Sequence, residues 1–171
     1  MLSHLTIENI AVMERAEIAF ESGFCVLTGE TGAGKSILID SINAVLGERT
    51  SRELIRTGCD RASVSALFCG CSREVLDKVE ELGLPVEEDG SVLLQRTLSI
   101  DGKSVCRLNG QLLTASMLRE VAGRLVHIHG QHDNQALLKA ESHMTFIDRL
   151  GALGGLLEKY RQSYQQVLEA K

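Results

Sequence analysis

The sequence is poor in aromatic residues and has no tryptophan, and this scarcity limits how its core and surfaces can be built. Aromatic residues make up 4% of the 171 positions, whereas hydrophobic residues as a whole make up 44%. We therefore expect a globular core of leucine, isoleucine, valine and alanine rather than a disordered chain. The sequence also has no basic stripe interleaved with aromatic residues, the pattern typical of surfaces that bind single-stranded nucleic acid.

Positive charge is scarce as well. The chain has 18 lysine and arginine residues against 23 aspartate and glutamate residues, so its formal net charge is −5. This balance gives no support to a generally basic nucleic-acid surface. A local basic patch is still compatible with an acidic total.

The chain lacks the marks of a secreted, membrane-spanning or zinc-binding protein. Its five cysteines are scattered, and the spacing of Cys69 and Cys71 does not match the paired ligands of a structural zinc site. We expect reduced, mostly buried thiols in a cytoplasmic protein. No segment approaches the ~20 apolar residues that span a bilayer, and the first residues do not resemble a secretion signal, so no membrane partner is expected.

The most informative feature present is a complete phosphate-binding loop at residues 29–36. It matches the pattern G-x-x-x-x-G-K-[ST], follows an apolar run at Phe24–Thr28 and opens a helix-like stretch over residues 35–46. That run is interpreted as a buried strand, because strand, loop and helix are the context that the pattern requires. The expected nucleotide-binding residues are Gly29, Glu30, Thr31, Gly32, Ala33, Gly34, Lys35 and Ser36.

The chemistry of this loop predicts binding of ATP with Mg²⁺. Its glycines let backbone amides turn inward around phosphate oxygens, and the helix N-terminus adds partial positive charge. Lys35 is expected to reach the β- and γ-phosphates, and the Ser36 hydroxyl to bind Mg²⁺. The alternative is a glycine-rich turn before an ordinary helix.

The remaining pattern predicts an α/β protein. Helix-ending signals lie at Gly47 and at Gly83-Leu84-Pro85, and Asp101-Gly102 and Asn109-Gly110 are turn signals. Strands are expected at 2–10, 15–20, 61–69, 91–99, 104–108 and 124–128, and further helices at 72–82 and 114–123.

The last segment has a heptad-like rhythm. Apolar or aromatic residues recur at intervals of four and three, at Leu153, Leu157, Tyr160, Tyr164 and Val167. One interpretation is an amphipathic helix that packs on the domain, and the other is the start of a coiled coil. The second is favoured because no helix-ending signal follows. The expected domains are residues 1–150, a nucleotide-binding lobe, and residues 151–171, the start of a coiled-coil helix.

P-loop ATPases use an acidic residue at the end of a strand to hold Mg²⁺ and activate water. The sequence shows no convincing residue of this kind. Asp40 lies one helical turn beyond the loop, and Asp148 falls in an expected helix and precedes an arginine. The chain is therefore expected to hold the nucleotide-binding half of a site without its hydrolytic half.

A polar cluster follows the strand expected at 124–128. His127 and His129 alternate onto one strand face, and His132 and Asp133 come next. These side chains suit a transition-metal site. Alternatively, they form a loop at the nucleotide, in which Gln131 contacts Mg²⁺ and the attacking water.

Several segments together resemble the SMC-like ATPases. They are Leu5–Asn9, Ile18–Phe20 with Gly23, and the loop ending at Ser36. The arginine-rich stretch 46–58 and the sequence Ile128–His132 resemble the RecN family of that group, whose members repair double-strand breaks in bacterial DNA. The resemblance extends from residue 1 to about 150, and the final helix fits the start of that family's coiled coil.

The resemblance implies an ABC-type head lobe with a mixed sheet, in a cytoplasmic, nucleoid-associated DNA repair and recombination ATPase. A C-terminal lobe carrying the Walker B and signature motifs, a second head and DNA would be its partners, so this segment alone is expected not to hydrolyse ATP. Gln131 matches the glutamine-loop residue of the Mg²⁺ shell and, with Lys35, would serve catalysis. Arg49, Arg52 and Arg56 lie where relatives carry an arginine-bearing loop near nucleotide or DNA.

Two other functions remain open at this point. One is an ATPase subunit of ABC-transporter type, against which the terminal heptads argue. The other is a non-enzymatic metal or nucleotide sensor that uses the histidines His127, His129 and His132.

Overall fold

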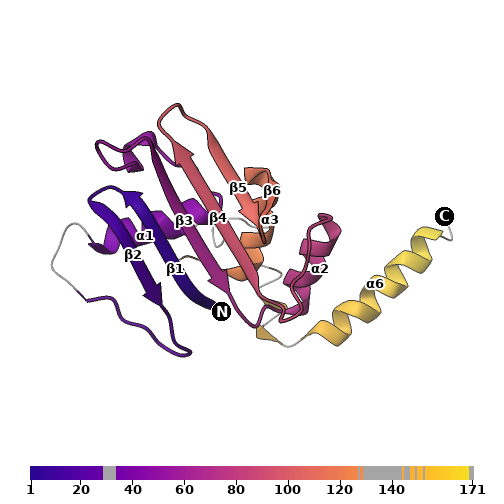
Figure 1. Ribbon diagram of the computed structural model, residues 1–171. Coiled ribbons are helices and arrows are strands. Elements are labelled where there is room, and N and C mark those ends of the chain that lie inside the picture. The colour runs from indigo at the N-terminus through magenta and orange to yellow at the C-terminus, as the bar shows by residue number, and fades with distance from the viewer. Residues whose placement is uncertain are drawn as a thin grey trace. The chain divides into compact units, whose positions relative to one another are not determined.

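The computed structural model describes residues 1–28, 34–126, 128, 144, 147–148, 150–151 and 153–169. Its contacts group the chain into two compact units, Met1–His127 and Ile128–Lys171, and each is described by itself. The larger unit is an α/β structure, as the sequence predicts (Figure 1).

A six-stranded sheet organises the larger unit, with the strand order β2-β1-β3-β4-β5-β6 (Figure 1). β2 and β6 form its two edges. The strands are β1 (Leu2–Ile10), β2 (Met13–Ala19), β3 (Arg61–Phe68), β4 (Val92–Ser99), β5 (Ser104–Leu108) and β6 (Gln111–Leu113). Every pairing between these strands is antiparallel.

The strand expected at Phe24–Thr28 is wrong for the structure, and the sheet of the described residues is antiparallel throughout, whereas a mixed sheet was expected. Residues 24–28 have no regular secondary structure, and Phe24 is 94% exposed. A strand needs a partner for its amides and carbonyls. Among the residues that the structure describes, none pairs with this run. The run is apolar, but an apolar run does not reveal which partner strand it pairs with.

Alternation along the central strands places their apolar residues on the face that the helices cover. In β3, Val64 lies opposite Ile7 of β1, and Ala66 lies between Leu5 of β1 and Leu94 of β4. These residues are buried, together with Phe68. The intervening positions are more polar, as in Thr6, Ser65 and Gln95, which lie side by side across three strands. One buried and one polar face is typical of an antiparallel sheet.

Helices α1 (Gly34–Val45) and α3 (Ala115–Leu125) lie on the same face of the sheet, behind it in Figure 1. α1 contacts β1, β3 and β4, and α3 contacts β5. The helix expected from residue 35 to the glycine at position 47 is confirmed. Gly47 ends it with a φ of 94°, a left-handed conformation that favours glycine. A short 3₁₀ helix, η1 (Arg52–Leu54), follows.

The strand expected at 124–128 is wrong at its start, because Arg124 and Leu125 complete α3. The amide of Val126 still donates to the carbonyl of Ala122, at 3.1 Å. Arg124 also donates from Nη1 to the carbonyl of Glu120, at 2.7 Å, a contact that stabilises the last helical turn.

The sequence does not predict the brief strand β6, because three residues are too few for a periodic signal.

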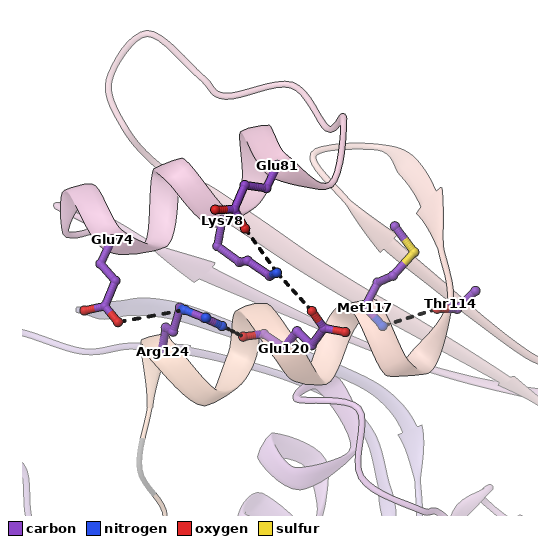
Figure 2. A network of polar contacts seen from close by, with 7 residues as sticks. All are labelled: Glu74, Lys78, Glu81, Thr114, Met117, Glu120 and Arg124. Atoms are coloured by element: carbon purple, nitrogen blue, oxygen red, sulfur yellow. Dashed lines mark hydrogen bonds and ion pairs between the residues drawn. The ribbon is translucent and has the colours of Figure 1, made fainter. Parts of the chain in front are cut away.

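Helix α2 (Arg73–Glu81) packs beside α3, and charged side chains join the two helices (Figure 2). The Lys78 ammonium lies 3.1 Å from a carboxylate oxygen of Glu120 and 3.2 Å from one of Glu81. Hydrogen bonds to Glu120 and then to Glu81 raise the pKa of Lys78 above its ordinary value. Lys78 therefore stays charged at neutral pH. Its contribution to stability is present below the unfolded-state pKa and is lost only as the pH rises through the higher folded-state pKa.

Thr114 caps α3, and its removal gives a first testable prediction. Its hydroxyl accepts a hydrogen bond from the Met117 amide at 3.2 Å (Figure 2), whereas Ser72, at the same position of α2, makes no such bond. We expect Thr114→Ala to lower the free energy of unfolding by about 1 kcal/mol. Ser72→Ala is the matched control and should cost clearly less in urea denaturation. Equal losses would contradict the assignment of the cap.

The smaller unit contains α6 (Gly154–Glu169), a 16-residue helix, so the expected terminal helix is confirmed. The stacked rings of Tyr160 and Tyr164 have centroids 6.1 Å apart. Both side chains are exposed, and so is Val167. An apolar stripe at heptad spacing suits a partner helix, but the coiled coil itself stays a prediction. No helix in the described parts of the chain is long and apolar enough to span a membrane.

Candidate nucleotide-binding site

The described part of the phosphate-binding loop is the first turn of α1. Gly34, Lys35 and Ser36 open the helix, and all three are exposed. The first turn contains no acidic residue. Its free amides and partial positive charge are therefore not offset by a carboxylate of the same turn, which favours an anionic ligand.

Burial of one side of α1 fixes the position of this first turn. Ile37, Leu38, Ala44 and Val45 face the core and recur at helical spacing. Ser41 is fully buried, and its hydroxyl donates to the carbonyl of Ile37 at 2.7 Å. The Lys35 and Ser36 side chains lie in the same turns but away from this packed side. The packed helix thus places Lys35 and Ser36 at exposed positions of its N-terminus.

The other expected site residues lie outside the described residues. These are Gly29, Glu30, Thr31, Gly32, Ala33 and Gln131, and the alternative metal ligands His127, His129, His132 and Asp133. Their assignments stay predictions. In the part of the chain that the structure describes, no group of three or more histidine, cysteine, aspartate or glutamate side chains is placed to hold a metal ion.

The two acidic residues considered for a hydrolytic role lie on helices, as expected. Asp40 is exposed on α1, one turn beyond Ser36, and Asp148 is helical in the smaller unit. Neither ends a strand of the sheet.

The structure separates the three arginines that follow α1. Arg56 lies 3.6 Å from a carboxylate oxygen of Glu14, and its amide donates to the carbonyl of Asn9. Arg49 and Arg52 instead line a pocket together with Arg96 of β4. Sequence reasoning missed Arg96. The available signal was its position in β4, where it shares the buried parity of Leu94 and Leu98.

All five cysteine thiols are free, but the expectation that most of them are buried is wrong, because Cys25 is exposed and Cys106 alone among them is buried. Burial raises the pKa of Cys106 on β5 above its ordinary value, so this thiol is protonated at neutral pH. We assign it to the core.

The chain is similar in sequence to bacterial DNA repair proteins. It is 43% identical over 171 residues to DNA repair protein RecN of Halalkalibacterium halodurans, and 41% identical over 172 residues to that of Bacillus subtilis. These alignments cover 98% and 99% of this chain but 30% of each relative, so the chain spans about 30% of the length of the relatives it matches. A family model described as an AAA domain matches residues 4–80.

Solved structures with a similar fold are heads of SMC and RecF proteins. A structure from work on ATP-driven dimerization and DNA-stimulated activation of SMC ATPases has a TM-score of 0.61 at 25% identity, covering 87% of this chain and 98% of that one. The Smc head domain of Pyrococcus furiosus, with an extended coiled coil, has a TM-score of 0.67 at 23% identity, covering 99% and 46%. The ATP complex of the recombination mediator RecF has a TM-score of 0.58 at 16% identity, covering 80% and 34%. The fold is therefore that of an SMC-type ATPase head.

Proposed function

This chain is RecN-like in sequence over nearly its whole length, and from that premise we propose that it is the ATP-binding head segment of a DNA repair and recombination ATPase. The observation that carries the proposal is the first turn of α1. There, a lysine and a serine project from a helix that the core holds in place, directly after the loop sequence of residues 29–33. Fold and sequence similarity support the same function.

In the proposed site each residue has a distinct role. The loop amides from Gly29 to Gly34 cradle the phosphates, and Lys35 neutralises charge on the β- and γ-phosphates. Ser36 and Gln131 would hold the Mg²⁺ that accompanies ATP, which supplies charge compensation at the phosphates. The exposed hydroxyl and the absence of carboxylates in the first turn of α1 suit a metal that arrives bound to its nucleotide.

We place this segment in a larger assembly. A C-terminal lobe of the same protein would supply the acidic and signature residues, and a second head would enclose the nucleotide. ATP binding would then close two heads, and hydrolysis would open them and so move coiled-coil arms around DNA. The protein would act in the cytoplasm, associated with the nucleoid. The curated relatives favour neither a transporter subunit nor a metal sensor.

ATP turnover by the 171-residue chain tests the half-site part of this proposal. We expect steady-state phosphate release no greater than that of the Lys35→Ala variant, because no candidate strand-end carboxylate was found in the sequence. Addition of the proposed C-terminal lobe should raise turnover above that of the variant. Turnover that is present in the chain and disappears in the variant would instead place a catalytic base within these residues, with Asp40, Gln131 and Asp133 as the positions to examine.

A further inference from the structure

Two cysteines lie in the short connection between β3 and α2. Cys69 and Cys71 follow the last residue of β3, and α2 begins at Arg73. Both cysteine side chains are half-buried. The proposed nucleotide site uses neither thiol, and their spacing does not suit a structural zinc site. Disulfides that form in a reducing compartment are mostly transient and redox-sensing, so a pair of neighbouring thiols suits redox chemistry.

Gly70 shapes the backbone between the two cysteines. Its φ is 59°, in the left-handed region that favours glycine, and the chain bends there. A left-handed residue places the α-carbons of its two neighbours about 5.5 Å apart, the distance of two steps along a helix. Disulfides usually join α-carbons that are roughly 4.4–6.8 Å apart. The backbone therefore holds Cys69 and Cys71 within the range that a disulfide needs.

The connection can change its dihedral angles without loss of regular structure. Residues 69–72 belong to no helix or strand. Both ends of the connection are fixed. Phe68 is buried at the end of β3, and the carbonyl of Ser72 accepts hydrogen bonds from the amides of Val75 and Leu76 in α2. Closure of a disulfide thus needs rotations only within these few residues.

The two sulfur atoms have different environments. The Cys71 thiol donates to the carbonyl of Phe68, with 3.6 Å between sulfur and oxygen. Burial raises the pKa of Cys71 above its ordinary value, and the charge of a Cys69 thiolate raises it further. Because the repulsion between charges falls with distance, this second effect places the two sulfurs close together. Cys71 is held as a thiol, so a reacting thiolate is expected at Cys69.

We propose that Cys69 and Cys71 form a reversible disulfide when the protein meets a peroxide, and that this bond acts on the start of α2. The pair lies outside the phosphate-binding loop and uses none of its residues. The redox site therefore does not depend on the proposed ATPase function, and it can hold even if that function fails.

The oxidation has two steps. The Cys69 thiolate attacks one oxygen of hydrogen peroxide, the O–O bond breaks, and the other oxygen leaves as hydroxide, so that Cys69 becomes a sulfenic acid. The Cys71 sulfur then attacks the sulfenic sulfur, and the Cys71 proton leaves with the sulfenic hydroxyl as water. Overall, two thiols are oxidised to one disulfide and hydrogen peroxide is reduced to two waters. Two molecules of a small thiol such as glutathione reverse the change and leave as their own disulfide.

The disulfide changes how the chain enters α2. It removes the hydrogen bond from Cys71 to Phe68, because the bridged sulfur carries no proton. Ser72, the next residue, makes no side-chain hydrogen bond that would cap α2. Further along, buried Val75 and Val79 and the ion pairs to α3 hold the helix in place (Figure 2). We expect the first turn of α2 to shift while the rest of the helix stays packed.

Peroxide treatment of the reduced chain, followed by alkylation of free thiols and tryptic mass mapping, tests the proposal. Trypsin cleaves after Arg61 and Arg73, so residues 62–73 form one peptide that contains Cys69 and Cys71 and no other cysteine. We expect this peptide to escape alkylation and to lose the mass of two hydrogen atoms. Glutathione should restore both alkylation sites. Disulfides between molecules should be at least about tenfold rarer, because a neighbouring thiol has a far higher effective concentration.

Single substitutions separate the roles of the two thiols. Cys71→Ser should leave Cys69 as a sulfenic acid, which dimedone traps. Cys69→Ser should give about tenfold less trapped product at Cys71, because a raised pKa lowers the thiolate fraction. Cys59→Ser is the matched control, since Cys59 is also half-buried but has no cysteine beside it in the sequence. It should leave the disulfide in residues 62–73 unchanged.

Amide chemical shifts of the oxidised chain, measured by NMR, test the effect on α2. We expect changes at residues 72–76 and none in β2. Unchanged shifts at residues 72–76 in the oxidised chain would overturn the action on α2. Full alkylation of residues 62–73 after peroxide treatment would overturn the disulfide itself. So would conversion of both cysteines to sulfinic acid, which small thiols do not reverse.

Discussion

Replacement of Lys35 by alanine is expected to weaken ATP binding at least tenfold while the fold stays intact. The ammonium is the one side-chain cation in the first turn of α1, and its loss removes charge-assisted hydrogen bonds worth about 1.5–3 kcal/mol. The helix itself should persist, because its buried residues lie on the opposite side, from Ile37 to Val45. Titration of ATP by calorimetry, in the presence of Mg²⁺, measures the effect.

The matched control for this experiment is Lys159→Ala. Lys159 is exposed on α6, in the smaller unit. Its replacement removes the same charge from the chain as Lys35→Ala. It should leave the affinity for ATP unchanged. Unchanged affinity in Lys35→Ala, with an unchanged circular dichroism spectrum, would remove the nucleotide-site assignment. A loss of affinity accompanied by a loss of helical signal would show that Lys35 acts through folding.

Replacement of Phe68 by alanine is expected to lower the free energy of unfolding by about 3–5 kcal/mol. Phe68 is 1% exposed at the end of β3, and it pairs with Val92 of β4 and with Leu2 of β1. Truncation of its ring leaves a cavity that three strands would have to collapse to fill. A loss of this size is a large part of the stability of a small domain. Urea denaturation followed by circular dichroism measures it.

Phe24→Ala makes the same chemical change in the same unit and serves as the control. Phe24 is 94% exposed, so its truncation should change the free energy of unfolding by no more than about 0.5 kcal/mol. A cost close to that of Phe68→Ala would mean that residues 24–28 are packed in solution. The strand expected there from the sequence would then be present after all.

Local signals in the sequence predicted most of the larger unit. The alternation of apolar and polar residues from Ala62 to Phe68 predicted β3 and its buried face correctly. Alternation with a period of two residues is typical of a strand that has one buried face. The Asp101-Gly102 turn predicted the hairpin of β4 and β5. Gly47 predicted the end of α1, because a left-handed residue is needed there. Each of these features depends on neighbours in the chain.

The features that were missed depend on residues far apart in the sequence. The apolar run at 24–28 has no strand beside it in the described residues, and nothing local indicates this. Arg96 lies in a strand that the sequence predicts, but its partners are the carbonyls of Ala44 and Glu48, about fifty residues away. The loop at 29–33 and Gln131 are still known only from their sequence pattern.

The two edges of the sheet have a consequence for the behaviour of the protein at high concentration. An outer strand with free amides and carbonyls can recruit a strand of another molecule, which leads to ribbon-like aggregates. Here one edge, β6, is three residues long. The other, β2, carries charged side chains at Glu14, Arg15 and Glu17. Both are arrangements that oppose lateral growth. We infer that the sheet resists edge-to-edge association of molecules, so that crowding in solution does not extend it.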